Sequence, residues 1–63
     1  MKLTDRELDV LKRISDGRTA KGIAADIGLS EDTLKDYSFR IRWKLNAKTI
    51  PHAVAIAVRA RLV

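Results

Sequence analysis

The sequence has no cysteine, one proline, three glycines and three aromatic residues. The absence of cysteine excludes disulfides, thiolate nucleophiles and cysteine-ligated zinc, and it fits a reducing cytoplasm. No stretch reaches the roughly 18 apolar residues of a membrane span, and Met1-Lys2-Leu3 leads into a helix signal instead of a secretory signal sequence. The composition and length predict one small cytoplasmic domain, residues 1–63, without membrane association.

Acidic residues are absent from the second half of the chain. Residues 1–36 carry seven Lys and Arg and eight Asp and Glu, whereas residues 37–63 carry six Lys and Arg and no acid. The six are Arg40, Arg42, Lys44, Lys48, Arg59 and Arg61. A purely cationic segment suits an anionic partner such as a phosphate backbone. On charge alone, a solvated basic face fits equally well.

Capping residues predict a first helix over about 5–16. Thr4 and Glu7 have the spacing of a capping box, and Leu3 can form the accompanying hydrophobic staple. Gly17 ends the helix, because glycine readily takes the left-handed conformation of a helix C-terminus. The expected inward residues are Leu8, Leu11 and Ile14, with Val10 at the edge of the face.

Two further helices are predicted in immediate succession, over about 20–27 and 31–45. Thr19 caps the first, Gly28 ends it, and Ser30 caps the second. This is the helix-turn-helix arrangement, in which glycine allows the sharp turn. In the longer helix the expected inward residues are Leu34, Tyr37, Ser38, Ile41 and Leu45. The opposite face presents Asp32, Lys35, Asp36, Phe39, Arg40 and Trp43.

A fourth helix over about 50–61 is predicted from the Thr49 cap and from Pro51 in its first turn. It is apolar nearly all the way round, so one packing face cannot use all of its side chains. We expect the core to take Val54, Val58 and Leu62. The apolar residues left over, and expected in a homodimer contact, are Ala53, Ile56, Ala57 and Ala60. The alternative is an alanine-rich helix chosen for helix propensity.

A family resemblance runs through nearly the whole chain. The residues that carry it are Leu3-Thr4-x-Arg6-Glu7-x-x-Val10-Leu11, Gly17, Lys21, Ile23-Ala24, Leu29-Ser30-x-x-Thr33-Leu34-Lys35, Ile41, Lys44-Leu45 and Ala53-Val54. They resemble the LuxR/FixJ-type (GerE-like) DNA-binding domain. The resemblance implies an all-α, four-helix fold whose third helix enters the DNA major groove and whose fourth commonly makes a homodimer. Such domains usually sit at the C-terminus of a larger regulator.

The resemblance also implies which residues meet double-stranded DNA. Phosphate contacts fall near Thr19, Lys21, Ser30 and Thr33. Base or groove contacts fall to Lys35, Asp36, Phe39 and Arg40. Trp43, four residues after Phe39 on the same outward face, is expected at the edge of the groove if the domain binds DNA. The chain departs from the family at Tyr37, where histidine is frequent, and by carrying Asp36, Phe39 and Trp43 on the face that should meet DNA. An aspartate can accept from cytosine N4 and a phenylalanine can touch a thymine methyl.

The sequence contains no constellation typical of an enzyme. It lacks a phosphate-cradling glycine loop, a Ser-His-Asp order and zinc-ligand spacing, and the lone His52 has no metal-binding partners, so no cofactor or metal is expected. The predicted function is sequence-specific DNA binding by a homodimeric transcription regulator. One alternative is an interaction protein, or antiactivator, that dimerises with a full-length LuxR-type regulator and blocks it. A promoter-contacting region of a sigma-like factor is a weaker alternative.

Overall fold

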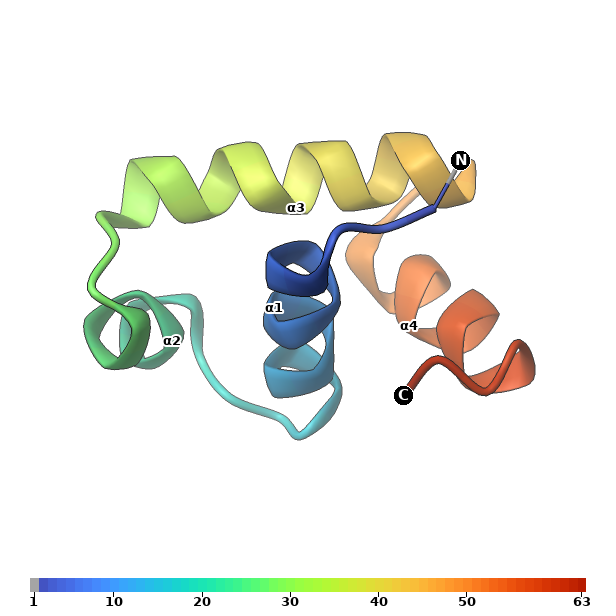
Figure 1. Cartoon of the computed structure of the whole chain (residues 1–63), viewed down its shortest axis with the longest axis horizontal. Coiled ribbons are helices and arrows are strands. Elements are labelled where there is room, and N and C mark those ends of the chain that lie inside the picture. Colours follow the sequence, from blue (N-terminus) through green and yellow to red (C-terminus); the bar gives the residue numbers. More distant parts are fainter. Residues whose placement is uncertain (1) are drawn as a thin grey trace.

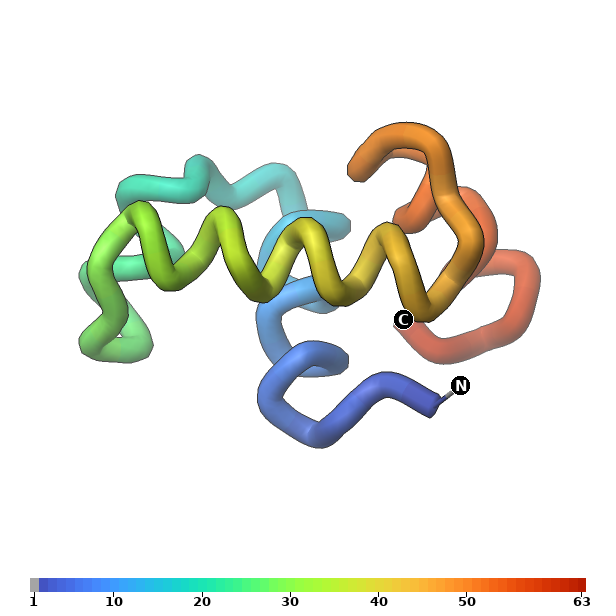
Figure 2. Tube along the Cα trace, turned by 90° about the horizontal axis from the view of Figure 1, so that it is seen from above, coloured from blue at the N-terminus to red at the C-terminus, as the bar shows by residue number. Residues whose placement is uncertain are grey.

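Four helices form the regular structure of residues 2–63, the part of the chain that the computed structural model describes (Figure 1). They are α1 (Asp5–Ser15), α2 (Ala20–Ile27), α3 (Glu31–Leu45) and α4 (Ile50–Arg59). Seen from above, α3 runs across the other three helices (Figure 2). The predicted all-α, four-helix class is confirmed. Met1 lies outside the described residues.

Each helix begins at a hydroxyl residue that caps it. The four N-caps are Thr4, Thr19, Ser30 and Thr49, and each side chain accepts a hydrogen bond from the backbone N–H three residues further on. The capping box is complete, because the Thr4 N–H also donates to Glu7 Oε1 at 2.8 Å. The helix starts are therefore as predicted, and they follow from local hydrogen bonding.

The helix ends show where the chain must turn. Gly28 closes α2 in the left-handed region with φ +71°, and Asn46 closes α3 with φ +54°. The first and last helices are slightly shorter than expected, ending at Ser15 and at Arg59. Arg61, the predicted last residue of the fourth helix, has φ +58°, which is outside right-handed helical geometry.

The core takes side chains from all four helices. Its buried hydrophobic members are Val10, Leu11, Ile23, Ala24, Leu34, Ile41, Ala53 and Ala57. Val10, expected at the edge of its face, has no exposed surface. Among residues 2–63 no helix combines the length and the apolarity needed to cross a membrane.

The buried face of α4 differs from the sequence-based prediction. Ala53 and Ala57 have no exposed surface, so their expected place on an outward dimer contact is wrong. Val58, expected in the core, is 54% exposed, and Leu62 is also exposed. Of the three residues expected to bring the fourth helix into the core, Val54 alone packs against the core cluster. The helix α4 packs on α1 and α3, and both alanines belong to the core cluster. A helix that is apolar all round has no periodicity that would predict this buried face.

Candidate nucleic-acid interface

The outer face of α3 is exposed along its whole length. The six residues predicted there, Asp32, Lys35, Asp36, Phe39, Arg40 and Trp43, are all exposed. Phe39 is 61% and Trp43 is 62% exposed, a large apolar area for a surface helix. This face therefore combines cations, carboxylates and aromatic rings in four turns.

The two cations expected to meet DNA are available for an external anion. Within residues 2–63, neither Lys35 nor Arg40 forms an ion pair. The Arg40 guanidinium lies over the Tyr37 ring, 4.8 Å from its centroid. This contact orients Arg40 along the helix without neutralising its charge.

The hydroxyl groups expected at phosphates sit at the starts of α2 and α3. Thr19 Oγ1 accepts from the Gly22 N–H at 3.1 Å. Ser30 Oγ accepts from the Thr33 N–H at 3.1 Å and donates to Thr33 Oγ1 at 2.9 Å. Lys21 is exposed near the start of α2. The structure thus gives Thr19 and Ser30 a capping role and brings both to helix N-termini, where anions are favoured.

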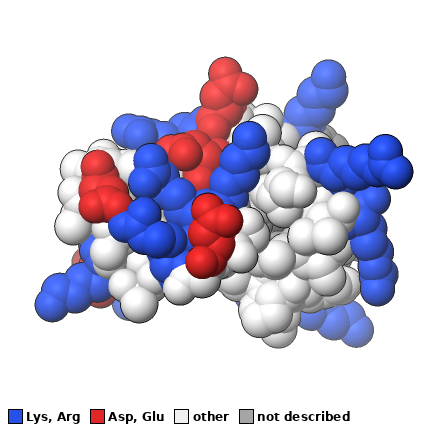
Figure 3. All heavy atoms as spheres, turned by 90° about the horizontal axis from the view of Figure 1, so that it is seen from below, with Lys and Arg blue, Asp and Glu red and all other residues white. Residues whose placement is uncertain are grey.

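Several cations of the first half are already neutralised by nearby carboxylates. Arg13 Nε lies 3.3 Å from Asp9 Oδ1, and Arg13 Nη1 lies 3.8 Å from Asp26 Oδ2. Arg18 also pairs with Asp26. Figure 3 shows acidic and basic side chains intermingled on the face opposite α3. The paired cations Arg13 and Arg18 are consequently less available to a polyanion than Lys35 and Arg40 are.

A buried ion pair joins the start of α1 to the end of α3. Lys44 Nζ donates to Glu7 Oε1 at 2.7 Å, and the Glu7 side chain is 1% exposed. Burial raises the pKa of Glu7, but hydrogen bonds from Lys44 and Thr4 outweigh it and hold the pKa below its ordinary value of 4.5. The sequence predicted only a capping-box role for Glu7, and it indicated Lys44 as one of the cations of the acid-free second half without a buried partner. The one signal in the sequence for this ion pair was the position of Lys44 on the flank of the inward face of α3.

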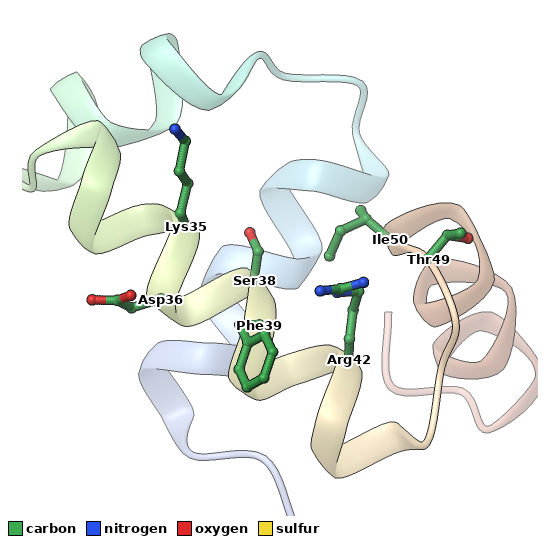
Figure 4. Close-up of a pocket in the computed structure, with 7 residues that line it drawn as sticks. All are labelled: Lys35, Asp36, Ser38, Phe39, Arg42, Thr49 and Ile50. Atoms are coloured by element: carbon green, nitrogen blue, oxygen red, sulfur yellow. The ribbon is translucent and has the colours of Figure 1, made fainter.

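A depression lies between α3 and the beginning of α4 (Figure 4). Its volume is about 590 Å³, and its walls include Lys35, Ser38, Phe39, Arg42 and Ile50. Arg42 Nη1 donates to the Lys48 carbonyl oxygen at 3.3 Å, and the guanidinium lies 5.7 Å from the Phe39 ring centroid. The sequence did not reveal this depression, because the chain between α3 and α4 forms part of it.

The accessible apolar residues of α4 fall on two sides of the helix. At helical spacing, Pro51, Val54, Ala55 and Val58 form one stripe, which we call the α4 stripe. Ile56 is half-buried and Ala60 is exposed, and both lie on the other flank. None of these α4 residues carries a charge, and Figure 3 shows a wide uncharged area on the α4 side of the molecule.

The fold and the exposed face of α3 define a class of protein. A short helix, a glycine turn and a longer helix with a polar, cationic outer face are the elements of a helix-turn-helix DNA-binding domain. Residues 1–57 match the family of bacterial regulatory proteins called the luxR family, and the chain belongs to that family. It is thus a DNA-binding domain of a transcription regulator and not an enzyme, as predicted.

Individual relatives agree with the family. The chain is 41% identical over 61 residues to a putative transcriptional regulator of Pseudomonas aeruginosa, covering 97% of this chain and 30% of the relative. It is 44% identical over 57 residues to the transcriptional regulatory protein YdfI of Bacillus subtilis, covering 90% of this chain and 27% of the relative.

A solved structure shows the same fold in a longer protein. The crystal structure of the response regulator ChrA, from a heme-sensing two-component system, superimposes with a TM-score of 0.92 at 28% identity. The match covers all of this chain and 31% of ChrA. The chain therefore spans less than a third of the length of these similar proteins.

Proposed function

We propose that the chain binds double-stranded DNA sequence-specifically by placing α3 in the major groove. The observation that carries this proposal is the exposed outer face of α3, where Lys35 and Arg40 have no carboxylate partner among the described residues. The major groove is wide enough for a helix, and Lys or Arg side chains read guanine O6 and N7 there. Lys35 and Arg40 are the proposed base-reading cations.

The remaining residues of the α3 face adjust which bases are preferred. Asp36 accepts hydrogen bonds only, so it favours the amino groups of cytosine or adenine and disfavours other bases. Phe39 brings an apolar surface suited to a thymine methyl or a sugar. Trp43, in the last turn of α3, lies at the edge of the groove near the backbone.

Phosphate contacts supply most of the affinity and fix the orientation of the domain. The proposed contacts are Thr19, Lys21, Ser30 and Thr33. Figure 2 shows the beginnings of α2 and of α4 on the same side of α3. One strand of the duplex therefore passes along that side, where hydroxyl groups and Lys21 meet its phosphates.

Half-site pairing is the proposed role of α4. Val58 exposes 54% of its surface at the C-terminal end of the α4 stripe, and a helix on a two-fold axis would cover it with its own copy. Ile56 and Ala60, expected in this contact from the sequence, lie on the opposite flank and give the competing surface. A dimer formed through either of these two surfaces would read two half-sites of an operator.

A salt titration tests the proposal. The chain is used to select a duplex from a random-sequence pool, called the selected duplex below, and its affinity is then measured at increasing salt concentration. With about three to five phosphate contacts per protomer, and about 0.9 counterion released at each, log K falls steeply with log salt. An affinity independent of salt, or failure to enrich any sequence, would contradict the proposal.

The exposed aromatic pair supports a second candidate function. Phe39 and Trp43 stand one turn apart, and such rings also anchor protein partners in hydrophobic pockets. In that case the chain would bind a full-length LuxR-type regulator and block it, with Asp32 and Asp36 at the rim of the contact. DNA is favoured, because the cations beside the rings suit phosphates without further assumption.

A further inference from the structure

The depression between α3 and α4 has the chemistry of a receptor for one unit of nucleic-acid backbone. We propose that it holds a deoxyribose-phosphate of the bound DNA, with the Arg42 guanidinium on the phosphate and with Phe39 and Ile50 against the sugar. This inference rests on the proposed DNA-binding function and adds to it a backbone site at the junction of α3 and α4, beyond the proposed phosphate contacts at the starts of α2 and α3.

Arg42 is held in a fixed position while most of its donors stay free. One donor, Nη1, is used by the Lys48 carbonyl oxygen at 3.3 Å, and no carboxylate pairs with Arg42 within residues 2–63. The Phe39 ring supports the guanidinium on one side, with the two groups 5.7 Å apart. A guanidinium has five N–H donors in a planar fork that fits two phosphate oxygens at once. Arg42 therefore meets a phosphate with little loss of conformational entropy.

The walls of the depression divide into a polar and an apolar part. Ser38 and Thr49 contribute hydroxyl groups, and Lys35 contributes a second cation. Asp36 contributes one carboxylate at the edge of the polar part, whereas Phe39 and Ile50 contribute apolar surface. In Figure 4 the Arg42 guanidinium lies beneath Ile50, and the Asp36 carboxylate points away from both. A free inorganic anion would bind the cations and leave the apolar side chains of the wall without a contact. A sugar joined to a phosphate uses both.

The size and the position of the depression agree with this ligand. Its volume of about 590 Å³ leaves room for a sugar beside a phosphate. Lys35 and Phe39 belong both to the depression and to the outer face of α3, so a duplex lying along α3 passes directly over it. Its lining includes Ile50, the first residue of α4, and α4 begins on the same side of α3 as α2 (Figure 2). The proposed phosphates of one strand therefore extend from Lys21 to Arg42.

Neutral phosphate analogues test the site directly. A set of selected duplexes is made, each with one phosphate replaced by a methylphosphonate, and the loss of affinity is mapped for three proteins. These are the parent, Arg42→Gln, and Lys12→Gln as a control that removes an exposed cation of α1. Glutamine keeps an N–H donor but carries no charge.

We expect the parent and Lys12→Gln to be sensitive at the same phosphates, and Arg42→Gln to lose sensitivity at one phosphate per half-site. The salt slope of Arg42→Gln should fall by about 0.9 per protomer. An unchanged map and slope overturn this inference while leaving the proposed function intact. A parent insensitive at every phosphate contradicts the proposed function itself. If Arg42→Gln fails to fold by circular dichroism, Arg42→Lys takes its place. It should keep the salt slope but bind several-fold more weakly, and parent-like affinity would overturn the inference.

Discussion

Lys44 Nζ and Glu7 Oε1 are 2.7 Å apart although the two residues lie 37 positions apart in sequence, and this buried ion pair joins the end of α3 to the start of α1. The same oxygen accepts the Thr4 N–H at 2.8 Å. The Glu7 carboxylate therefore accepts hydrogen bonds from both the cap of α1 and the last turn of α3. In a domain of this size, the position of α3 on α1 depends heavily on such a contact.

Replacing Lys44 by methionine should destabilise the fold by about 3 kcal/mol, because the apolar stem is kept while the buried carboxylate loses its cation. Urea unfolding followed by circular dichroism measures the free energy of unfolding. Lys12→Met removes an exposed cation and should change it by less than about 0.5 kcal/mol. Equal losses in the free energy of unfolding for Lys44→Met and Lys12→Met would mean that the buried ion pair stabilises the fold no more than an exposed cation does.

The lowered pKa of Glu7 predicts a specific loss of stability in acid. Because the folded pKa lies below the ordinary value of 4.5, the ionised carboxylate stabilises the fold above that pH. This stability disappears as the pH falls from 4.5 through the folded pKa. Thermal unfolding of the parent and of Glu7→Gln between pH 7 and pH 3 isolates the contribution. The difference in stability between them should shrink below pH 4.5, and a constant difference would contradict the assignment.

Lys35 and Arg40 should each matter for recognition rather than for folding. Alanine at either position should weaken binding to the selected duplex by about 1–3 kcal/mol and relax the preference at one base pair. Repeating the selection with each variant shows which base pair loses its preference. If both variants bind and select like the parent, α3 is not the helix that reads the groove.

One substitution on each apolar surface of α4 tests which of the two surfaces forms the dimer. Val58→Glu puts an unpaired charge into the α4 stripe and should give a folded monomer that binds a two-half-site duplex about tenfold or more weakly. Ala60→Glu, on the opposite flank, should leave both properties unchanged. Sedimentation gives the oligomeric state. The reverse result would assign the dimer to the surface of Ile56 and Ala60, and a parent that stays monomeric on DNA would exclude both.

Local signals in the sequence predicted the helices but not the faces they bury. Thr4, Ser30 and Gly28 act through neighbours within a few residues, so capping and turn chemistry placed the helix starts and the helix-turn-helix. Ala53 and Ala57 could not be placed, because α4 is apolar on every side and its packing partners are distant in sequence. The outward face of α3 was predictable, since its polar and apolar residues follow the helical period.

The features that were missed all depend on non-local contacts. Glu7 meets Lys44 only after α1 and α3 have packed. The depression at Arg42 needs the Lys48 carbonyl oxygen and the side chain of Ile50, which the turn after α3 brings to its flank. No spacing rule within one helix indicates either arrangement.

Trp43 offers the most direct measurement of the central claim, that α3 is the surface that meets DNA. It is the only tryptophan in the chain and is 62% exposed near the end of α3. Its fluorescence is titrated with the selected duplex and with a scrambled duplex of equal length and charge, at a salt concentration that suppresses non-specific binding. The account predicts a saturable shift or quenching with the selected duplex alone. An emission that stays unchanged on DNA binding, but shifts on adding a full-length luxR-family regulator, would contradict it and identify α3 as a protein-docking surface.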